Sequence, residues 1–427
     1  MVDDEWSSSV WAASRDNPSR EKPSRNDGSW RSRTAAETFA LLRPHWQTFG
    51  ITRVANITGL DVVGIPTALA VRPNARSLSA SQGKGLTLEQ AKVSALMEAV
   101  ELFHAEQAAL HVTWGSIGGV RKSSPLALDG LPRMVASLDD GWECGWVSGR
   151  DLFSGVTLPV PFELVHMDLT LPPPPGSGVF QLGSNGLGSG NDLGEATVQA
   201  LYELIERDAR TLFFLRSSEE RQMRRVRLES VAVADCQSLI EQFLAAGLLV
   251  AIWDVTSDIA LPTFLVAVLE GADDAFYSVG LAYGSACHVD PGVALVRALT
   301  EAAQTRLTRI SGVRDDMPPE QFDALRVPPT VKRDRDRIVS ERSLLDMAAP
   351  GGFSPSSREG ELEFLLGALC AVGLEQAVLV DLSRRELPIS VARCVVPGLE
   401  GIIESPAYAP GLRARAAMRV SGITPGA

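Results

Sequence analysis

Pairs of glutamates three residues apart recur in this sequence within a longer repeated pattern. The pattern A-x-V-x-A-L-x-E-x-x-E occupies residues 91–101 and residues 196–206, and a third copy over residues 294–304 has glutamine in its last position. Residues three apart lie on one face of a helix, about one turn from each other. The pattern therefore predicts three related helices, each with an apolar side for packing and two acidic or amide side chains on a shared face.

If the first two helices face each other, their glutamates converge as a cluster of four carboxylates, Glu98, Glu101, Glu203 and Glu206. Carboxylates tolerate such proximity when cations lie between them. Oxygen ligands suit magnesium, which keeps part of its water shell and binds phosphate oxygens. A di-iron centre would require Glu-x-x-His on two of the helices, which the three copies of the repeat do not provide. One E-x-x-E pair alone is usually a solvated helix face, but the aligned copies favour a magnesium site.

Glycines precede the first two helices at matched positions. Gly83 corresponds to Gly188, and Gly85 corresponds to Gly190. Backbone N–H groups at a helix N-terminus can hold anions, so this context favours phosphate beside the metal. Lys84 can direct a positive charge at such phosphates, although the P-loop pattern G-x-x-x-x-G-K-[ST] is absent.

Three arginines lie on or just after the second and third helices. They are Arg207, Arg297 and Arg306. Guanidinium groups make forked hydrogen bonds to phosphate oxygens. Any one of them alone would more often be a surface residue, but beside the acidic pairs they predict contacts to the phosphates of a nucleotide.

The apolar periodicity and the positions of proline and glycine predict the elements that carry these residues. Helices are expected over 35–48, 87–108, 193–214, 238–246, 291–309 and 361–372. Strands are expected on both sides of a turn at 59–66 within 51–73, within 111–170, and at 248–255, 263–270, 377–382 and 389–396. A polyproline connection is expected at 172–175, a glycine-rich loop at 183–190 and a charged surface excursion at 312–360.

Length and composition bound the organisation of the chain. Its 427 residues, 45% hydrophobic and 22% charged, are typical of a folded protein with two or three sub-domains or one large mixed fold. Residues 1–34, rich in Ser, Arg, Asp and Asn, are predicted to be a disordered tail. Residues 35–427 are predicted to be one domain, with a nucleotide-site core at about 50–320 and a C-terminal mixed segment at about 321–427.

Charge and cysteine usage exclude several classes of function. The net charge of −12 argues against general nucleic-acid binding, which requires a basic surface. The five cysteines are widely spaced and form no C-x-x-C pair, so neither a disulfide framework nor a zinc site is indicated. No apolar run approaches the roughly 18 residues of a membrane span, and the N-terminal segment has no signal-peptide pattern. We therefore expect a cytoplasmic protein without nucleic-acid or membrane partners.

Several ordered motifs together resemble the YcaO family. They are Ser81-Gln82-Gly83-Lys84-Gly85, Glu98-x-x-Glu101, Ser184-Asn185-Gly186-x-Gly188-x-Gly190-Asn191, Glu203-x-x-Glu206-Arg207 and Arg297-x-x-x-Glu301-x-x-Gln304-x-Arg306. The resemblance covers about residues 50–320. It implies an α/β (α+β) fold with a pseudo-repeated core, in which mixed or antiparallel sheets and long helices surround a central nucleotide site.

By this resemblance, ATP and Mg²⁺ are the expected cofactors, and the four glutamates are the expected metal ligands. The residues expected to contact the nucleotide are Lys84, Gly188, Asn191, Glu195, Arg207, Arg297, Glu301, Gln304 and Arg306. Of these, Lys84, Arg207 and Arg297 are the expected catalytic cations, because positive groups stabilise the charge that develops during phosphoryl transfer. Gly188 stands where some family members have a serine, and the neighbouring Ser189 offers a hydroxyl in its place.

Members of the family phosphorylate a peptide amide oxygen, and the attacking nucleophile decides whether an azoline, a thioamide or a macrocyclic amidine results. Azoline-forming members commonly end in Pro-x-Pro-x-Pro, whereas this sequence ends in Gly-Ile-Thr-Pro-Gly-Ala and shows no fused leader-binding domain. Residues 50–66 look like those of TfuA-associated members linked to thioamidation. The expected function is therefore ATP-dependent activation of a backbone amide in a ribosomally made peptide, with a thioamide as the expected product.

The resemblance also implies partners: a precursor peptide, a TfuA-like protein or a separate leader-binding protein, and a second copy in a homodimer. Azoline or amidine formation remains an alternative product. Two alternatives come from other classes, a non-catalytic peptide-binding scaffold with a decayed nucleotide site and a plain ATP ligase acting on a small amide or carboxylate. The retained glutamates and arginines argue against the scaffold, and ADP formation that requires a peptide would argue against the ligase.

Overall fold

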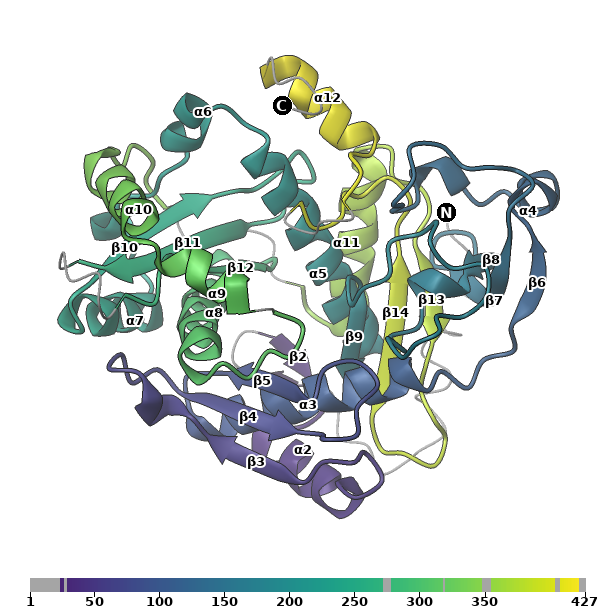
Figure 1. The fold of residues 1–427 in the computed structure, drawn as a ribbon, viewed down its shortest axis with the longest axis horizontal. Coiled ribbons are helices and arrows are strands. Elements are labelled where there is room, and N and C mark those ends of the chain that lie inside the picture. The colour runs from purple at the N-terminus through teal and green to yellow at the C-terminus, as the bar shows by residue number, and fades with distance from the viewer. Residues whose placement is uncertain are drawn as a thin grey trace.

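The computed structural model describes residues 24–26, 29–271, 278–317, 319–347, 355–403 and 408–421. Its three main sheets stand around a central helix, α5 (Leu193–Phe214), as Figure 1 shows. The strands within each of these sheets pair antiparallel. This combination of helices with antiparallel sheets confirms the predicted fold class.

The sheets are built as follows. The first contains, in spatial order, β3 (Arg53–Asn56), β4 (Thr67–Val71) and β5 (Ala80–Lys84). The second contains β6 (Thr113–Ser116), β7 (Glu143–Asp151), β13 (Val378–Asp381), β14 (Ser390–Val395) and β9 (Leu187–Gly190), and β8 (Thr157–Pro161) also pairs with β7. The third contains β10 (Leu248–Asp254), β11 (Thr263–Glu270) and β12 (Ala282–Cys287). A separate pair is formed by β1 (Ser24–Asn26) and β2 (Ser29–Arg31).

A unit of one strand followed by one long helix occurs three times. β5 leads into α3 (Leu88–Glu106), β9 leads into α5, and β12 leads into α8 (Pro291–Ser311). Polar residues cap the three helix N-termini, and their side chains accept hydrogen bonds from backbone N–H groups of the first turn; they are Thr87, Asp192 and Asp290. The repeat in the sequence therefore corresponds to three structural units, and all three predicted helices are confirmed.

The three units close into a ring, because each long helix packs on its own strand and also on the strand of the next unit. α3 contacts β9, α5 contacts β12, and α8 contacts β5. β5, β9 and β12 are also the edge strands of their sheets, so one unpaired edge of each sheet belongs to this ring. The acidic faces of the three helices consequently lie around one centre.

Glycines permit the close contact between strand and helix in each unit. A Cβ atom at Gly83, Gly188 or Gly284 would overlap backbone atoms of the helix that follows, α3, α5 or α8. A Cβ atom at Gly85 or Gly190 would collide with the first turn of α3 or α5. The matched glycines of the sequence are therefore required for packing, whether or not phosphate binds near them.

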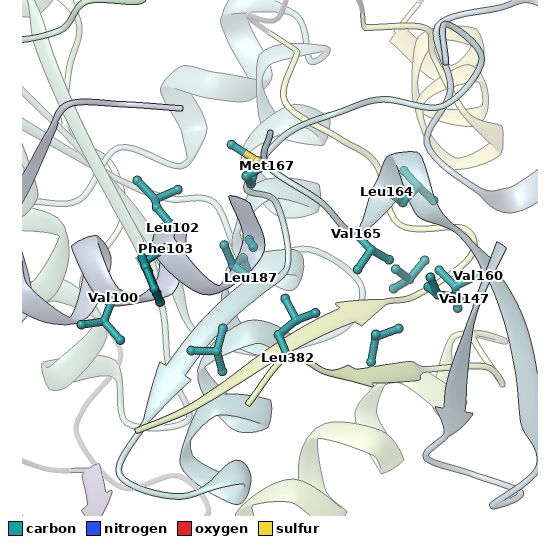
Figure 2. Close-up of a cluster of buried hydrophobic side chains, with 14 of the residues drawn as sticks. Val100, Leu102, Phe103, Val147, Val160, Leu164, Val165, Met167, Leu187 and Leu382 are labelled. Carbon is teal, nitrogen blue, oxygen red and sulfur yellow. The ribbon is translucent and has the colours of Figure 1, made fainter. Parts of the chain in front are cut away.

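The largest apolar cluster lies between α3 and the second sheet (Figure 2). Val100 and Phe103 of α3 belong to it together with Val147 of β7, Val160 of β8 and Leu187 of β9. All five side chains are buried. This packing fixes which side of α3 faces the sheet.

The other helices cover the sheets. They are α2 (Ala35–Leu42), α4 (Ile117–Ser123), α6 (Ser218–Met223), α7 (Ala234–Ala245), α9 (Pro319–Arg326), α10 (Pro328–Ser340), α11 (Arg358–Ala371) and α12 (Leu412–Ser421). The helix expected over 35–48 ends at Leu42, and a 3-10 turn at Arg43–His45 containing Pro44 follows it. The loop expected at 183–190 becomes strand β9 from Leu187 onward.

The prediction of a surface excursion at 312–360 is wrong for much of the described part of this segment. α9 and α10 lie within it, and Val331 and Ile338 of α10 are buried against the third sheet. Pro319 and Pro328 stand at the first positions of these helices, where proline favours a helix start because its missing N–H would have no partner there. The prolines that suggest a loop in the sequence therefore begin two helices.

The sequence predicts a disordered tail over residues 1–34, but the last part of this range has defined structure. β1 and β2 pair with each other, and Ser32 donates its hydroxyl to Asp192 at 3.1 Å and to Glu195 at 3.0 Å. Residues 1–23 and 27–28 lie outside the described residues. No helix in the part of the chain that the structure describes is long and apolar enough to cross a membrane.

Candidate active site

The carboxylates of α3 and α5 lie within electrostatic range of each other at the centre of the ring. Burial raises the pKa of Glu101 well above its usual range, and the charge of Glu203 raises it further. Burial also raises the pKa of Glu203 to about 7, against the opposing charge of Arg207 and with the help of Glu206. The structure therefore brings together glutamates that the sequence predicted to converge from two helices.

The pKa values of Glu98 and Glu206, the other members of the two pairs, are raised in the same way. Burial raises the pKa of Glu98 to about 7, although the charges of Arg314 and Lys84 oppose the rise. Burial raises the pKa of Glu206 as well. Four carboxylates whose ionised forms are all disfavoured constitute a site that a cation would stabilise.

The donor set fits magnesium bound together with phosphate better than a preformed metal cage. Among the described residues, no group of three or more His, Cys, Asp or Glu side chains is arranged to hold one ion. Magnesium typically uses one or two carboxylates and completes its shell with water and phosphate oxygens. His104, three residues after Glu101, lies in the core, where its Nδ1 bonds to the Val100 carbonyl at 2.8 Å. It therefore does not extend the acid pair into an iron-type ligand set.

Each strand of the ring presents one polar side chain to a glutamate of the long helix that packs on it from the neighbouring unit. Lys84 of β5 forms an ion pair with Glu301 of α8. Burial raises the pKa of Glu301, but the charges of Lys84 and Arg207 outweigh it and lower the pKa overall. Ser285 of β12 adds a backbone N–H that donates to Glu301 at 3.3 Å. The predicted residues Lys84 and Glu301 therefore meet directly.

Two serines occupy the positions equivalent to Lys84 in the other units. Ser285 follows Gly284 and donates its hydroxyl to Glu206 at 2.6 Å. Ser189 follows Gly188, donates to the Met97 carbonyl at 3.4 Å and hydrogen bonds to Glu101, which lowers the pKa of that carboxyl against its burial. Sequence reasoning missed Ser285, because Gly284 stands ten residues before its copy of the repeat, whereas Gly83 and Gly188 stand eight residues before theirs. The signal was another glycine followed by a polar and a small residue.

Gly188 has a packing role that differs from the predicted nucleotide contact. Its α-carbon faces the backbone of α5, where a side chain would overlap Ala196 and Ala200. Ser189 lies on the opposite side of β9, because successive residues of a strand point to opposite faces. The hydroxyl of this unit therefore belongs to Ser189, which contacts Glu101, and its role beside a nucleotide stays a prediction.

Two of the three predicted arginines lie at the centre. The guanidinium of Arg207 is 3.8 Å from the nearest carboxylate oxygen of Glu206. Arg297 of α8 donates to Gln199 of α5 at 3.4 Å, and burial, with the nearby charge of Arg31, lowers its pKa to about 10. A buried cation of this kind is stabilised by an anionic ligand. Arg207 and Arg297 thus lie beside the acidic centre, and their contact with phosphate stays a prediction.

Arg306 is placed differently from the prediction. Its side chain is 3% exposed, forms two hydrogen bonds to Asp61 at 2.9 and 3.2 Å, and forms a third to Glu270 at 2.7 Å. Three charge-assisted bonds leave this guanidinium committed to protein carboxylates. Arg306 therefore anchors the loop that contains Asp61 and does not contact the centre. Gln304, two residues earlier, ties α8 to β5 through a 3.4 Å bond to the Gln82 carbonyl.

Asn191 and Glu195 lie at the start of α5, beside the N-terminal segment. Glu195 accepts hydrogen bonds from the backbone and side-chain nitrogens of Asn191 at 2.9 and 3.1 Å and from the hydroxyl of Ser32 at 3.0 Å. Thr38 donates to the side-chain oxygen of Asn191 at 3.0 Å. Two residues predicted to contact the nucleotide are thus held by a segment that the sequence assigned partly to a disordered tail.

The C-terminal part of the chain contributes a buried cation that sequence reasoning missed. Arg393 of β14 is fully buried and donates to the Asn185 carbonyl at 2.8 Å and the Val165 carbonyl at 3.2 Å. Burial lowers its pKa to about 10, against the opposing charges of Glu203 and Glu101. Its only signal in the sequence was an arginine inside an otherwise apolar strand.

Comparison with known proteins agrees with this arrangement. Residues 82–400 match the family model described as YcaO cyclodehydratase, ATP- and Mg²⁺-binding. An uncharacterized protein from the tfuA 3′ region of Rhizobium leguminosarum bv. trifolii is 38% identical over 399 residues, which cover 90% of this chain and 92% of the relative. The family match bears out the expected cofactors, ATP and Mg²⁺.

Solved structures share the fold. A heterocyclase in complex with substrate and cofactor superposes with a TM-score of 0.68 at 20% identity, over 89% of this chain and 54% of the heterocyclase chain, so this chain spans about half of that protein. YcaO from Methanopyrus kandleri, bound with AMPPCP and Mg²⁺, superposes with a TM-score of 0.64 at 22% identity over 90% of this chain and 98% of that chain. The repeated acid pairs, the fold and the match over residues 82–400 together establish that this chain belongs to the YcaO family.

Proposed function

We propose that this protein uses ATP and Mg²⁺ to phosphorylate a backbone amide oxygen of a ribosomally made peptide, and that sulfur then replaces this oxygen. The single observation that carries the proposal is the ring formed by the acid pairs of α3 and α5 and by Glu301 of α8, with Lys84, Arg207 and Arg297 beside it. Carboxylates for divalent cations and fixed positive groups for phosphate are the two components that phosphoryl transfer requires.

The residues of the centre would have different roles in phosphoryl transfer. The glutamates of α3 and α5 would hold Mg²⁺, which when bound neutralises phosphate charge. Arg207 and Arg297 are directed at the same centre and would stabilise the negative charge of the transferring group. Lys84 is oriented by its ion pair with Glu301, so that its ammonium keeps a fixed position while phosphate oxygens approach.

The atoms balance in two steps. The amide oxygen attacks the γ-phosphorus of ATP, and the bond to the β-γ bridging oxygen breaks to release ADP. A sulfide equivalent adds to the amide carbon, and inorganic phosphate leaves with the former amide oxygen. The product is a thioamide, and the proton balance is completed by the sulfide and the departing phosphate.

Thioamide formation is favoured over ring closure by two observations. The relative from the tfuA 3′ region matches most of this chain, and residues 50–66 resemble TfuA-associated members. The heterocyclase among the structural relatives keeps azoline formation as the second candidate. Reconstitution with the precursor peptide, ATP, Mg²⁺, sulfide and a TfuA-like protein tests the choice by mass spectrometry: thioamidation raises the peptide mass, whereas a product that has lost one water would contradict it.

The proposed partners are the precursor peptide, a TfuA-like protein or a separate leader-binding protein, and a second copy of this chain. Light scattering of the purified protein tests the homodimer. Calorimetric titration with ATP and Mg²⁺ tests the non-catalytic scaffold alternative, which predicts no binding. The dependence of ADP release on a peptide separates the proposed activity from a ligase that acts on small molecules.

A further inference from the structure

Helix α5 carries side chains of different kinds along one face. Glu195 lies in its first turn, Glu203 and Glu206 lie in its middle, and Arg210 and Phe214 lie in its last turns. Their spacings are close to whole numbers of helical turns, which keeps them on one side. At 1.5 Å per residue, Glu195 stands about 16 Å before Glu206, and Phe214 stands about 12 Å after it. The helix therefore places the central acids between two chemically different ends.

The geometry of phosphoryl transfer assigns a role to each end. The attacking and leaving oxygens lie roughly in line on opposite sides of the phosphorus. The family resemblance assigns Asn191 and Glu195, at the first end of α5, to the nucleotide, so ADP would leave toward that end. The peptide amide must then approach from the other end, where Arg210 and Phe214 lie.

A polar side chain links the centre to that second end. Ser285 of β12 donates its hydroxyl to Glu206 at 2.6 Å and accepts from Arg210 at 3.5 Å. Its backbone N–H donates to Glu301, and β12 is the edge strand of its sheet. The edge of β12 that has no strand partner among the described residues therefore faces the acidic centre at Ser285.

A connected row of half-buried side chains continues from this point toward the surface. The guanidinium carbon of Arg210 lies 5.6 Å from the centroid of the Phe214 ring. Phe214 meets Tyr283 edge to face at 5.9 Å, and Arg337 of α10 donates to the Tyr283 hydroxyl at 3.1 Å. All four side chains are half-buried. We call Arg210, Phe214, Tyr283 and Arg337 the aromatic-cation strip.

We propose that the aromatic-cation strip binds the peptide residues next to the modified amide and favours acidic and aromatic side chains. Two guanidinium groups attract carboxylates on a chain whose net charge is −12. The two rings lie side by side and offer stacking surfaces, and a guanidinium group stands at each end of the row. This inference rests on the proposed function, because the direction of transfer assigns the strip to the peptide.

Fluorescence anisotropy with model peptides tests the proposal, in the presence of Mg²⁺ and a non-hydrolysable ATP analogue. The probes are labelled Gly-Ser-Phe-Asp-Phe-Asp-Ser-Gly, a version with lysine for aspartate, and a version with alanine for phenylalanine. The wild-type protein should bind the first peptide roughly tenfold more tightly than either other version, as expected for one charge-assisted contact or one aromatic contact.

Two variants and a matched control locate the effect. Arg337→Glu should lose the preference for aspartate over lysine, and Tyr283→Ala should lose the preference for phenylalanine over alanine. Arg333→Glu makes the same charge change on the same helix, at a side chain that is 73% exposed, and should leave all three affinities unchanged. Thermal unfolding confirms that each variant is folded.

Nucleotide binding measured on the same samples separates the two levels of the proposal. ATP should bind the strip variants with wild-type affinity, because the strip lies at the opposite end of α5 from Glu195. Absence of ATP binding by the wild-type protein would contradict the proposed function itself. Intact ATP binding, combined with equal affinity of the wild-type protein for the three peptides or with unchanged preferences in both strip variants, would overturn the peptide site alone.

Discussion

Glu203 and Glu301 stand at the same position of their repeats but differ in charge state. Burial raises the pKa of both carboxyls, and Glu203 reaches about 7. The charges of Lys84 and Arg207 instead bring the pKa of Glu301 below its usual value. Cations of the first two units therefore stabilise the ionised form of Glu301 in the third unit, whereas burial prevails at the acid pairs of α3 and α5. This difference explains why we assign the metal to the first two units.

The first prediction concerns the metal ligands. Glu98→Gln and Glu203→Gln should each leave a folded protein but reduce Mg²⁺-dependent ATP turnover by at least roughly a hundredfold. Each substitution removes the charge of a direct metal ligand, and this should reduce turnover more than the loss of a residue that only supports a ligand. Phosphate release at saturating Mg²⁺ measures the ATP turnover. Glu89→Gln on the exposed side of α3 is the matched control, and turnover equal to that of the control in both variants would defeat the assignment.

The second prediction concerns pH. In the metal-free folded protein Glu98 and Glu203 have pKa values of about 7, above the usual 4.5, so the folded state holds more protons than the unfolded state between these values. Stability from these groups is therefore present at low pH and is lost as the pH rises toward about 7. The unfolding free energy of Glu203→Gln in a chelator should fall less than that of the wild type between about pH 5 and pH 7.5. Parallel curves would show that Glu203 titrates normally.

At the scale of elements, the strand and helix of each unit approach so closely that only glycine fits at their contact. Gly188 is the test case, because β9 and α5 carry both Ser189 and the second acid pair. A larger residue there would push the strand from the helix and displace Ser189 relative to Glu101. Packing inside one unit and geometry at the centre are therefore coupled.

The third prediction is that Gly188→Ala destabilises the protein by about 1–3 kcal/mol, the usual cost of overpacking, because its methyl group would overlap the backbone of α5. Denaturant unfolding measures the change. Gly183→Ala, at a position with open space around it, should be close to neutral. Equal stabilities of the two variants would mean that β9 and α5 can separate without cost.

The fourth prediction concerns the N-terminal segment. Removal of residues 1–33 should weaken ATP binding, because the hydrogen bonds from Ser32 to Glu195 and Asp192 are lost. Removal of residues 1–23 alone keeps these bonds and is the control. Calorimetric titration compares the two, and identical affinities would show that the Ser32 contacts are irrelevant to the nucleotide.

At the scale of the whole molecule, the ring explains how distant segments form one centre. Each long helix touches the strand of the next unit, and β14, which follows the third unit by many residues, adds Arg393 between the first two acid pairs. The three sheets keep their other edges away from this point (Figure 1).

The repeated pattern was sufficient to predict the three long helices, because acid spacing and apolar periodicity are local properties. It predicted the meeting of the four glutamates only if the first two helices faced each other, and the structure supplies that condition. The sequence could not predict that Arg306 turns toward Asp61, since nothing local distinguishes it from Arg297. Arg393 carried no motif at all. α9 and α10 were missed because proline at a helix start resembles proline in a loop. Contacts between side chains of different units could therefore be found only from the structure.

The central claim is that the acid pairs of α3 and α5 bind magnesium jointly with nucleotide. Calorimetric titration of Mg²⁺ into the protein, with and without a non-hydrolysable ATP analogue, tests it most directly. We predict weak Mg²⁺ binding alone and binding at least roughly tenfold tighter with the analogue, as expected when phosphate oxygens complete the coordination. Glu101→Gln and Glu206→Gln should abolish the gain. Equal Mg²⁺ affinity with and without the analogue, or a full gain in both variants, would contradict the account.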